Sequence, residues 1–440
     1  MQKILVFLLA LSYLTSCTSV QQATRSNLGS AKSTAPKNII FMIVDGMGFE
    51  YVKAARIYNG QKALSYENFP CKTRVATCAY EGSNLGKDCV ATSNHITDSA
   101  AAATALATGV KVNNGVVSRA IPGNNTNIQT ILELAKSHNK STGIISTKLF
   151  TDATPAAFAG HADKRKHTEE ILRSIFEGST PHVIFGADTP MHRKYAHKSK
   201  ISYEFVSHVD ELNKLADKIA QGSNCEGSRC AHIYGGFGQQ AMIPGAFHKE
   251  DGLLLEIASQ EEFDKHGVPH LNQMTDAALK ILHKNSNGFF LMVESSMPDM
   301  IGHKNQQFDE SDVTPSAIAV LVREMMEVEN TINILQDFVT KNPDTLLILT
   351  ADHETGGLIV EDEKTDCLGE PNCLASVRWT SQKYEPENKD SLARHTGVDV
   401  PLYAVGTGSE RFCHERINNI DIKNLALGLE TNLTAQNTQE

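Results

Sequence analysis

The 440-residue chain lacks an excess of positive charge, because its formal net charge is −10. This balance argues against a general nucleic-acid-binding protein, which would carry a basic face. The chain also lacks internal repeats and, outside residues 18–37, low-complexity segments. Its N-terminal apolar run, residues 4–11, is too short to cross a membrane as a helix. With these classes set aside, the length suits a large core in one or two domains.

Cysteine pairs with CxxC spacing are absent too, which gives little support to a zinc–cysteine site. The chain has nine cysteines, and without Cys17 the number is even, as expected in an oxidising compartment. Cys225 with Cys230, and Cys367 with Cys373, are expected to close small loops. The other four cysteines allow three connectivities, and spacing does not choose among them: Cys71, Cys78, Cys89 and Cys413.

The N-terminus reads as a targeting segment. Lys3 precedes the apolar run, which predicts a signal peptide over residues 1–16. The following Leu14-Thr15-Ser16-Cys17 resembles a bacterial lipobox, which would make Cys17 the lipidated first residue of the mature chain. The alternative is a plain secretory signal with an incidental cysteine. Since Thr18 follows, the lipoprotein reading implies anchoring in the cell envelope, at the outer membrane rather than the inner one.

Residues 17–37 are polar and predict a flexible tether. Beyond it, short apolar runs without clear alternation predict strands that are buried on both faces: 38–44, 143–146, 182–185, 289–293, 345–350 and 402–405. Helical patterns lie between them, at 129–136, 275–283 and 316–339. This alternation predicts an α/β fold, a three-layer sandwich with a central, mostly parallel sheet and helices on both faces. We expect one catalytic domain over 38–430, with irregular insertions at about 187–270 and 361–394, and a tail at 431–440.

One serine occupies an informative position. Ser99 follows Asp98 and begins the alanine-rich run of residues 100–103. An alcohol at a helix N-terminus lies where unpaired N–H groups and the helix dipole favour an anion, such as a phosphoryl group. Ser99 therefore becomes a candidate nucleophile, provided that neighbouring groups lower its pKa.

Acids and histidines follow three of the predicted strands. Asp45 and Glu294 end two of them, and Asp352-His353 ends a third. One such acid often caps a helix, but three together point to a ligand site at the carboxyl edge of the sheet. Asp299 and His303, four residues apart, suit one zinc ion, with His395 as a third ligand. Asp45 and Asp352, together with His353, would hold a second ion near Ser99.

These segments together resemble the alkaline phosphatase family. The resemblance covers roughly residues 38–408, in the order of the family's motifs. The segments that carry it are 38–48, 97–105, 152–157, 289–303, 350–354 and 395–397.

The resemblance implies an alkaline-phosphatase-like fold, two Zn²⁺ and one Mg²⁺, and a phosphoserine intermediate on Ser99. It implies roles position by position. The first zinc would be held by Asp299, His303 and His395, and the second by Asp45, Asp352, His353 and the Ser99 oxygen. The magnesium would be held by Asp45, Thr154 and Glu294, with Asp152 beside it. Arg165 would grip phosphate, although its neighbours Lys164 and Lys166 also suit an ordinary solvated basic run.

Two segments depart from the family pattern. Met300 follows Asp299 where some members carry a basic residue or histidine, and residues 295–298 depart from a common glycine-rich form. Both departures bear on magnesium preference and phosphate affinity rather than on the reaction. His161, between Asp152 and Arg165, is expected to be structural.

The sequence thus predicts a metal-dependent phosphate monoester hydrolase that acts on small phosphate esters, without a nucleic-acid-binding surface and with a homodimer as a further expectation. A phosphodiesterase of the same superfamily is the alternative, and Arg165 favours the monoester because it pairs with terminal oxygens that a diester lacks. A sulfatase is disfavoured, because alanines follow Ser99 in place of x-Pro-x-Arg. A catalytically silent lipoprotein that binds phosphate or metal is a second alternative, and the intact nucleophile and ligand set count against it.

Overall fold

A computed structural model of the chain describes residues 35–80, 95–238, 267–305, 316–361, 365–381, 393–429 and 431, together with the backbone of 247–248 and 254–256. The expected signal peptide, Cys17 and nearly all of the tether and C-terminal tail lie outside these residues. Among the described helices, none is long and apolar enough to cross a membrane.

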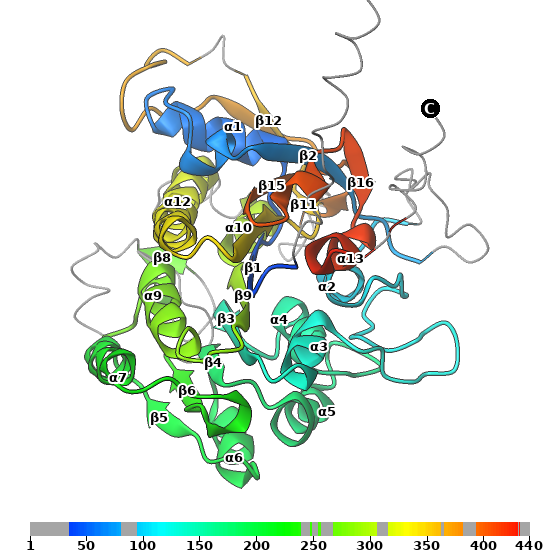
Figure 1. The fold of residues 1–440 in the computed structure, drawn as a ribbon. Coiled ribbons are helices and arrows are strands. Elements are labelled where there is room, and N and C mark those ends of the chain that lie inside the picture. The colour runs from blue at the N-terminus through cyan, green and yellow to red at the C-terminus, as the bar shows by residue number, and fades with distance from the viewer. Residues whose placement is uncertain are drawn as a thin grey trace, which may run out of the picture. The chain divides into compact units, whose positions relative to one another are not determined.

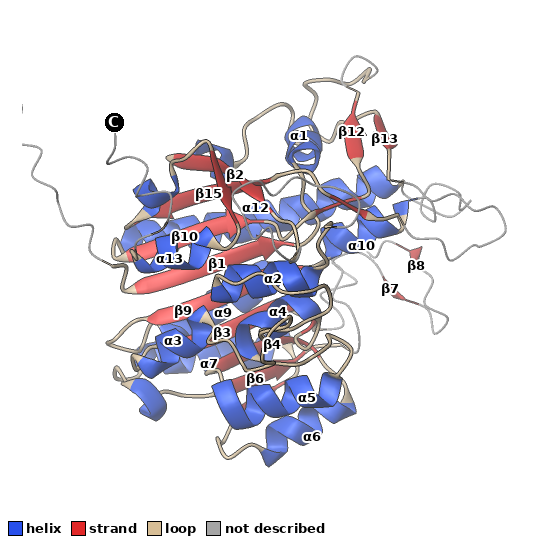
Figure 2. Ribbon diagram, turned by 90° about the vertical axis from the view of Figure 1, so that its right-hand side faces the viewer, coloured by secondary structure: helices blue, strands red, loops and turns tan. Residues whose placement is uncertain are grey.

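A ten-stranded sheet forms the centre of the fold (Figures 1 and 2). In spatial order its strands are β16 (Arg416–Asn418), β2 (Cys71–Ala76), β15 (Val400–Gly406), β10 (Thr345–Thr350), β1 (Asn38–Val44), β9 (Phe289–Ser295), β3 (Ser141–Leu149), β4 (Val183–Ala187), β6 (Ile233–Gly236) and β5 (Glu204–Val206). Only β15 runs antiparallel to its neighbours, β10 and β2. The predicted mostly parallel sheet is therefore confirmed.

Helices cover both faces of this sheet. One layer contains α1 (Phe49–Tyr58), α7 (Val209–Gln221), α9 (Leu271–Leu282), α10 (Met297–His303) and α12 (Ala317–Lys341). The other contains α2 (Ser99–Thr108), α3 (Ile131–Ser137), α4 (Ala153–Ala159) and α13 (Asp421–Leu427), while α5 (Thr168–Arg173) and α6 (Pro190–Lys198) lie towards the β5 end of the sheet. This arrangement confirms the three-layer sandwich.

The remaining elements are short. Two-stranded pairs are formed by β11 (Glu354–Thr355) with β14 (His395–Thr396), β12 (Leu358–Val360) with β13 (Val377–Trp379), and β7 (Phe247–His248) with β8 (Leu254–Glu256). The 3₁₀ helices are η1 (Ser65–Asn68), η3 (Gly227–Arg229) and η5 (Ser409–Phe412), and η2 (Ser174–Ser179) is a π-helical turn.

Apolar side chains explain why the central strands lie where they do. Every residue of β1, β9 and β10 is buried, as a strand covered on both faces requires. Polar residues explain the differences from the expected bounds. The strand predicted at 143–146 extends in β3 to Leu149, because Thr147 and Lys148 continue it beyond its apolar part. The helix expected from 275 begins at Leu271, where Gln273 accepts a hydrogen bond from the His270 N–H.

The segment expected to be an irregular insertion, about 187–270, needs a correction. Its described part contains α6, α7, the separate pair β7–β8, and the strands β5 and β6 of the central sheet. Strand β6 pairs with β4 and β5 pairs with β6, so that the sheet continues through this segment. Strand β6 is short and ends in Gly235-Gly236, so its sequence gives only a weak apolar signal. Strand β2 was not predicted from the sequence, because the exposed Lys72 and Arg74 interrupt its apolar residues.

Three disulfides connect described cysteines. The two expected small loops are closed by Cys225–Cys230 and Cys367–Cys373. Cys71 is bonded to Cys413, which selects among the connectivities that the sequence left open. Cys78 is disulfide-bonded as well, and Cys89 lies outside the described residues.

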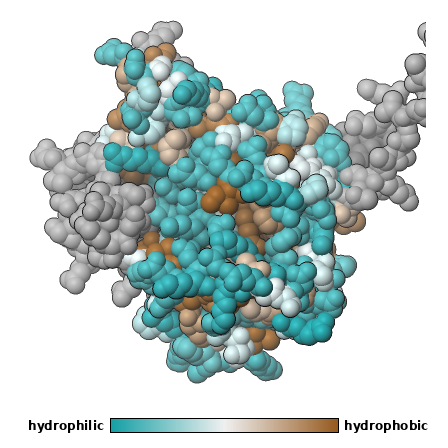
Figure 3. Space-filling model, turned by 60° about the vertical axis from the view of Figure 1, so that its left-hand side comes forward, coloured by the Kyte–Doolittle hydropathy of each residue, from teal (hydrophilic) through white to brown (hydrophobic). Residues whose placement is uncertain are grey.

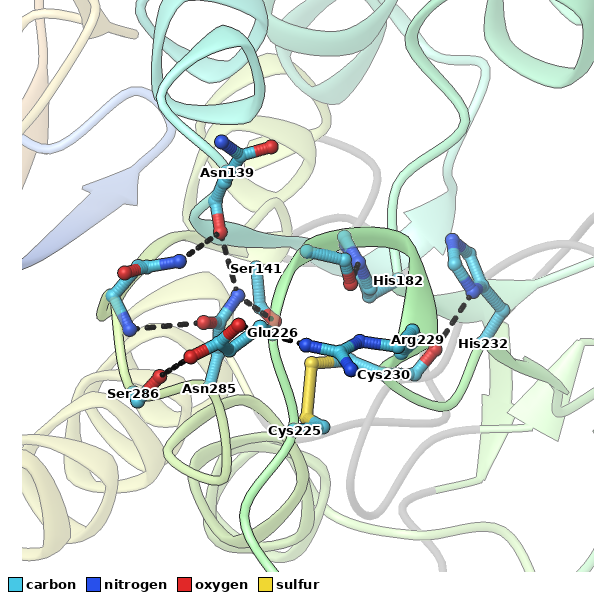
Figure 4. Close-up of a disulfide and its surroundings, with 12 residues drawn as sticks. Asn139, Ser141, His182, Cys225, Glu226, Arg229, Cys230, His232, Asn285 and Ser286 are labelled. Carbon is cyan, nitrogen blue, oxygen red and sulfur yellow. Dashed lines mark hydrogen bonds and ion pairs between the residues drawn. A yellow bond between two sulfur atoms is a disulfide. The ribbon is translucent and has the colours of Figure 1, made fainter.

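The Cys225–Cys230 loop packs beside two stacked histidines (Figure 4). The rings of His182 and His232 lie 4.2 Å apart. Since the Thr142 N–H donates to Nδ1 of His182 at 3.1 Å, the ring proton sits on Nε2 and points to the Gly227 carbonyl, 3.2 Å away. Burial, and after it the neighbouring His232, lowers the pKa of His182 to about 3. Burial lowers the pKa of His232 to about 4.

Because both histidines are neutral in the fold and take up protons more readily when unfolded, we expect the free energy of unfolding to fall as the pH drops from about 6.5 towards 4. The His232→Phe variant keeps a stacked ring but removes one titrating group. Its stability should lose about 1.4 kcal/mol less per pH unit over this range. Urea unfolding of chelator-treated protein at several pH values measures the slope, and identical slopes for variant and wild type would contradict this account.

Candidate metal centre and nucleophile

The carboxyl ends of three parallel strands bring the acids together. In register, Ile43 of β1 lies beside Thr350 of β10 and beside Glu294 of β9. Asp45 follows directly after β1, and Asp352 comes two residues after the end of β10, so both acids leave the sheet at the same edge as Glu294. All three carboxylates are almost fully buried.

Gly46 allows this turn to pass close to the next helix. Its φ is +77°, and a Cβ on it would lie 2.7 Å from the Cα of Asp299. Glycine therefore lets the chain after β1 approach the N-terminus of α10, which carries Asp299. The Gly46 N–H also donates to Oδ1 of Asp352, at 3.3 Å.

Asp299, His303 and His395 form one group, with ligand atoms all within 4.8 Å of one another. His303 Nδ1 lies 2.5 Å from the Ala393 carbonyl, and His395 Nδ1 lies 2.9 Å from the Thr97 carbonyl. Because a carbonyl only accepts, each Nδ1 carries a proton, and in the neutral ring each Nε2 then presents a lone pair. The two Nε2 atoms are 3.0 Å apart and 3.3 and 3.5 Å from Oδ1 of Asp299. Two lone pairs and a carboxylate at these distances suit a shared cation.

His353 links a second group. Thr355 Oγ1 donates to Asp299 at 2.5 Å, so it accepts from Nδ1 of His353 at 3.2 Å, and Nε2 of His353 keeps its lone pair. That Nε2 lies 3.1 Å from Oδ2 of Asp352 and 3.5 Å from Oδ1 of Asp45. Asp45, Asp299 and His353 also meet within 4.8 Å.

Two carboxylate oxygens in this group are buried and accept no hydrogen bond within the described structure: Oδ1 of Asp45 and Oδ2 of Asp352. The other oxygen of Asp352 accepts from the N–H groups of Gly46 and His353. An unsatisfied buried carboxylate oxygen is costly unless a cation completes it. The donor set therefore fits divalent metal ions, and histidine nitrogen with carboxylate oxygen is a combination that zinc accepts.

Ser99 lies against this second group as the first residue of α2. Its Oγ is 3.1 Å from Nε2 of His353, and the residue is 3% exposed. Asp98 caps the helix by accepting from the Ala101 N–H at 2.9 Å. The hydroxyl thus faces the unpartnered oxygens from a helix N-terminus, as a nucleophile directed at an anion requires.

A third carboxylate group contains Asp45 and Glu294, with Asp152 at its side. Thr154 Oγ1 donates to Oδ2 of Asp45 at 3.4 Å, and Ser146 Oγ donates to Oε2 of Glu294 at 2.5 Å. Burial, and after it the charge of Asp352, raises the pKa of Asp45 well above its ordinary value. Burial likewise raises the pKa of Glu294 to about 8. Both shifts express the cost of placing these charges together without a cation.

Asp152 and Arg165 lie at the side of this group. The Arg165 guanidinium is 3.1 Å from Oδ1 of Asp152 and 3.3 Å from Oδ2 of Asp98. Burial lowers the pKa of Arg165, but the charges of Asp152 and Asp98 outweigh burial and raise it. The side chain is 34% exposed and already held in place by two carboxylates.

The structure brings together every metal-site residue and the nucleophile named from the sequence, and Asp152 is paired there with Arg165 and Lys148. His161 lies elsewhere, with its ring nitrogens at the Ser118 carbonyl and Glu133, in keeping with a structural role. Sequence reasoning missed the part of Asp98 in holding Arg165. The acid directly before the serine was the available signal.

Comparison with known proteins agrees with this geometry. The family model described as "Alkaline phosphatase" matches residues 36–183 and 239–385. Alkaline phosphatase 3 of Bacillus subtilis is 27% identical, over 94% of this chain and 94% of its own length. The Escherichia coli alkaline phosphatase is 28% identical, over 84% of this chain and 81% of its own.

Among solved structures, the alkaline phosphatase of the Antarctic bacterium TAB5 shares the fold, with a TM-score of 0.64 and 23% identity. That likeness covers 90% of this chain and 98% of the other. The family model covers more than half of the sequence, and the relatives cover it nearly from end to end. The chain therefore belongs to the alkaline phosphatase family and is a phosphate monoester hydrolase.

Proposed function

We propose that the chain cleaves phosphate monoesters through a phosphoserine formed on Ser99, with two Zn²⁺ and one Mg²⁺ as cofactors. The observation that carries the proposal is the position of the Ser99 hydroxyl. It lies at a helix N-terminus, 3.1 Å from a histidine nitrogen whose ring is surrounded by buried, unpartnered carboxylate oxygens.

The donor sets, together with the family resemblance, support these cofactors. One zinc would be held by Asp299, His303 and His395, and the other by Asp45, Asp352, His353 and the Ser99 oxygen. Magnesium would be held by Asp45, Thr154 and Glu294. When bound, these ions supply positive charge that neutralises the phosphate dianion and lowers the pKa of the serine hydroxyl and of water.

The chain's own residues orient the reaction. Ser99 Oγ attacks phosphorus, its bond to phosphorus forms as the ester oxygen leaves, and water later breaks the phosphoserine bond to release inorganic phosphate. The N-terminus of α2 favours the anionic phosphoryl group beside Ser99. Arg165, pre-positioned by Asp98 and Asp152, donates two N–H groups to terminal phosphate oxygens.

The number of terminal oxygens separates a monoester from a diester. A monoester has three terminal oxygens and a diester has two. If the bound metal ions contact one of them, a guanidinium that donates to two more requires the third oxygen that only a monoester has. The diesterase, which was the alternative from the sequence, is therefore disfavoured by Arg165, although the metal groups alone do not distinguish the two esters.

We further propose that the protein is anchored in the cell envelope through a lipid on Cys17, at the outer membrane. Support comes from the lipobox-like segment 14–17 and from the polar tether after it. A homodimer stays an expectation of the family resemblance.

One face of the molecule is mostly hydrophilic, with hydrophobic residues in small separate patches (Figure 3).

Ser99→Ala removes the proposed nucleophile, so we expect kcat to fall by about three orders of magnitude or more. No phosphoenzyme should be found by intact-protein mass spectrometry after acid quench. Ser137→Ala, an exposed serine at the end of α3, is the matched control and should retain both turnover and phosphoenzyme. Wild-type turnover in the Ser99 variant would overturn the proposal.

Arg165→Lys keeps the charge but loses the forked donor. We expect kcat/KM for p-nitrophenyl phosphate to fall by about 10-fold or more, with a smaller effect on bis-p-nitrophenyl phosphate. Arg173→Lys, whose side chain is 59% exposed, should change neither. Equal losses for both esters would argue against contact between Arg165 and the terminal oxygens.

Removal of divalent ions with a chelator should abolish hydrolysis, because no positive charge of the ions then neutralises the phosphate dianion beside the buried carboxylates. It should also lower the melting temperature by at least ~5 °C, since ions bound only by the fold stabilise it. Added Zn²⁺ and Mg²⁺ should restore both. Chelated protein with full activity and an unchanged melting temperature would count against the metal centre.

A further inference from the structure

Lys148 brings a positive charge to the third carboxylate group, and no role assigned above uses it. It lies near the carboxyl end of β3, and its ammonium pairs with Oδ2 of Asp152, four residues further on. The side chain is only 30% exposed. Burial lowers the pKa of Lys148, but Asp152 first, and then the charges of Asp45 and Glu294, outweigh burial and raise it.

Both carboxylate oxygens of Asp152 already have partners in this arrangement. Its Oδ1 accepts from the Ala153 N–H at 2.9 Å and faces Arg165 at 3.1 Å, while Oδ2 is taken by Lys148. Asp152 is thus a carboxylate shared between two cations. Burial raises the pKa of Asp152, but the charges of Lys148 and Arg165 outweigh it and hold the pKa below its ordinary value.

The backbone fixes Lys148 beside Glu294 as well. Ser146 Oγ accepts from the Lys148 N–H at 3.0 Å and donates to Oε2 of Glu294 at 2.5 Å. Ser146 is also the register partner of Glu294 between β3 and β9. One hydroxyl therefore links the main chain at Lys148 to the carboxylate proposed as a magnesium ligand.

Within the described residues at and just after α10, no side chain adds a second such ion pair to this group. Met300, the neighbour of Asp299 on α10, is uncharged and partly buried. Lys304 lies at the end of α10. Burial, and after it the charge of Lys148, lowers the pKa of Lys304. Lys148 alone among these three is paired with an acid of the group.

We propose that Lys148 is a built-in cation of the third carboxylate group, which offsets part of the charge of Asp152, Asp45 and Glu294 and so keeps Mg²⁺ binding there weak. The inference rests on the proposed magnesium site. Lys148 is a positioning and charge-setting residue, since it acts through Asp152 and through the potential at the ligands of the ion. Coulomb repulsion between an ammonium and a divalent cation at such close range is large in a partly buried site.

The test is Mg²⁺ binding, measured by isothermal titration calorimetry on zinc-loaded protein. Lys148→Met removes the charge and keeps most of the apolar stem, so its dissociation constant for Mg²⁺ should fall by at least ~10-fold. Lys148→Gln should act in the same direction, and Lys148→Arg, which keeps the charge, should bind like wild type. Lys194→Gln, an exposed lysine of α6, is the control for net charge and should change nothing.

The direction of the change separates this role from a structural one. Damage to the site would weaken Mg²⁺ binding, whereas loss of a repelling charge tightens it. Unchanged or weaker binding in both neutral variants would overturn the inference, and so would the absence of Mg²⁺ binding in all proteins. Formation of the Ser99 phosphoenzyme, measured in the same preparations, shows whether the proposed function stands independently of this result.

Discussion

The crowding of buried carboxylates at one edge of the sheet is the constraint on which the rest of the site depends. Asp45, Asp352 and Glu294 leave three adjacent parallel strands at the same level, and Asp299 comes from the helix beside them. Burial raises the pKa values of Asp45 and Glu294, and the charges of neighbouring acids raise them further, because charges of one sign repel one another in a buried site. Such a cluster is stable only with cations. We infer that the fold uses this edge to bind metal ions and, through them, an anionic substrate.

Two different kinds of cation compensate the acids. On one side, the imidazole nitrogens of His303, His353 and His395 accompany the carboxylates, and the two kinds of ligand together suit metal ions. On the other side, Asp152 is already paired with Lys148 and Arg165. The two proposed zinc ions would lie in the first region, whereas in the second the chain's own cations pair with Asp152 beside the proposed magnesium site. The nucleophile, at the N-terminus of α2, lies against the first region, and Arg165 is held between Asp98 and Asp152.

Much of this could be predicted from the sequence, for physical reasons that also set the limits. Strands buried on both faces appear as unbroken apolar runs, and β1 has the bounds expected for it. By contrast, β2 alternates with exposed Lys72 and Arg74, and β6 is short and ends in glycines, so neither gave a clear signal. The pairing of Cys71 with Cys413 spans 342 residues, which spacing does not specify. In the sequence, Lys148 looks like an ordinary surface lysine. Only the fold shows that its ammonium pairs with Asp152 in the site.

Anomalous diffraction at the zinc absorption edge, from crystals grown with zinc, tests the central claim most directly. The account predicts two strong peaks, one bounded by Asp299, His303 and His395, and the other by Asp45, Asp352 and His353 beside Ser99. Peaks elsewhere, or a well-ordered site with these side chains in place and no zinc between them, would contradict it.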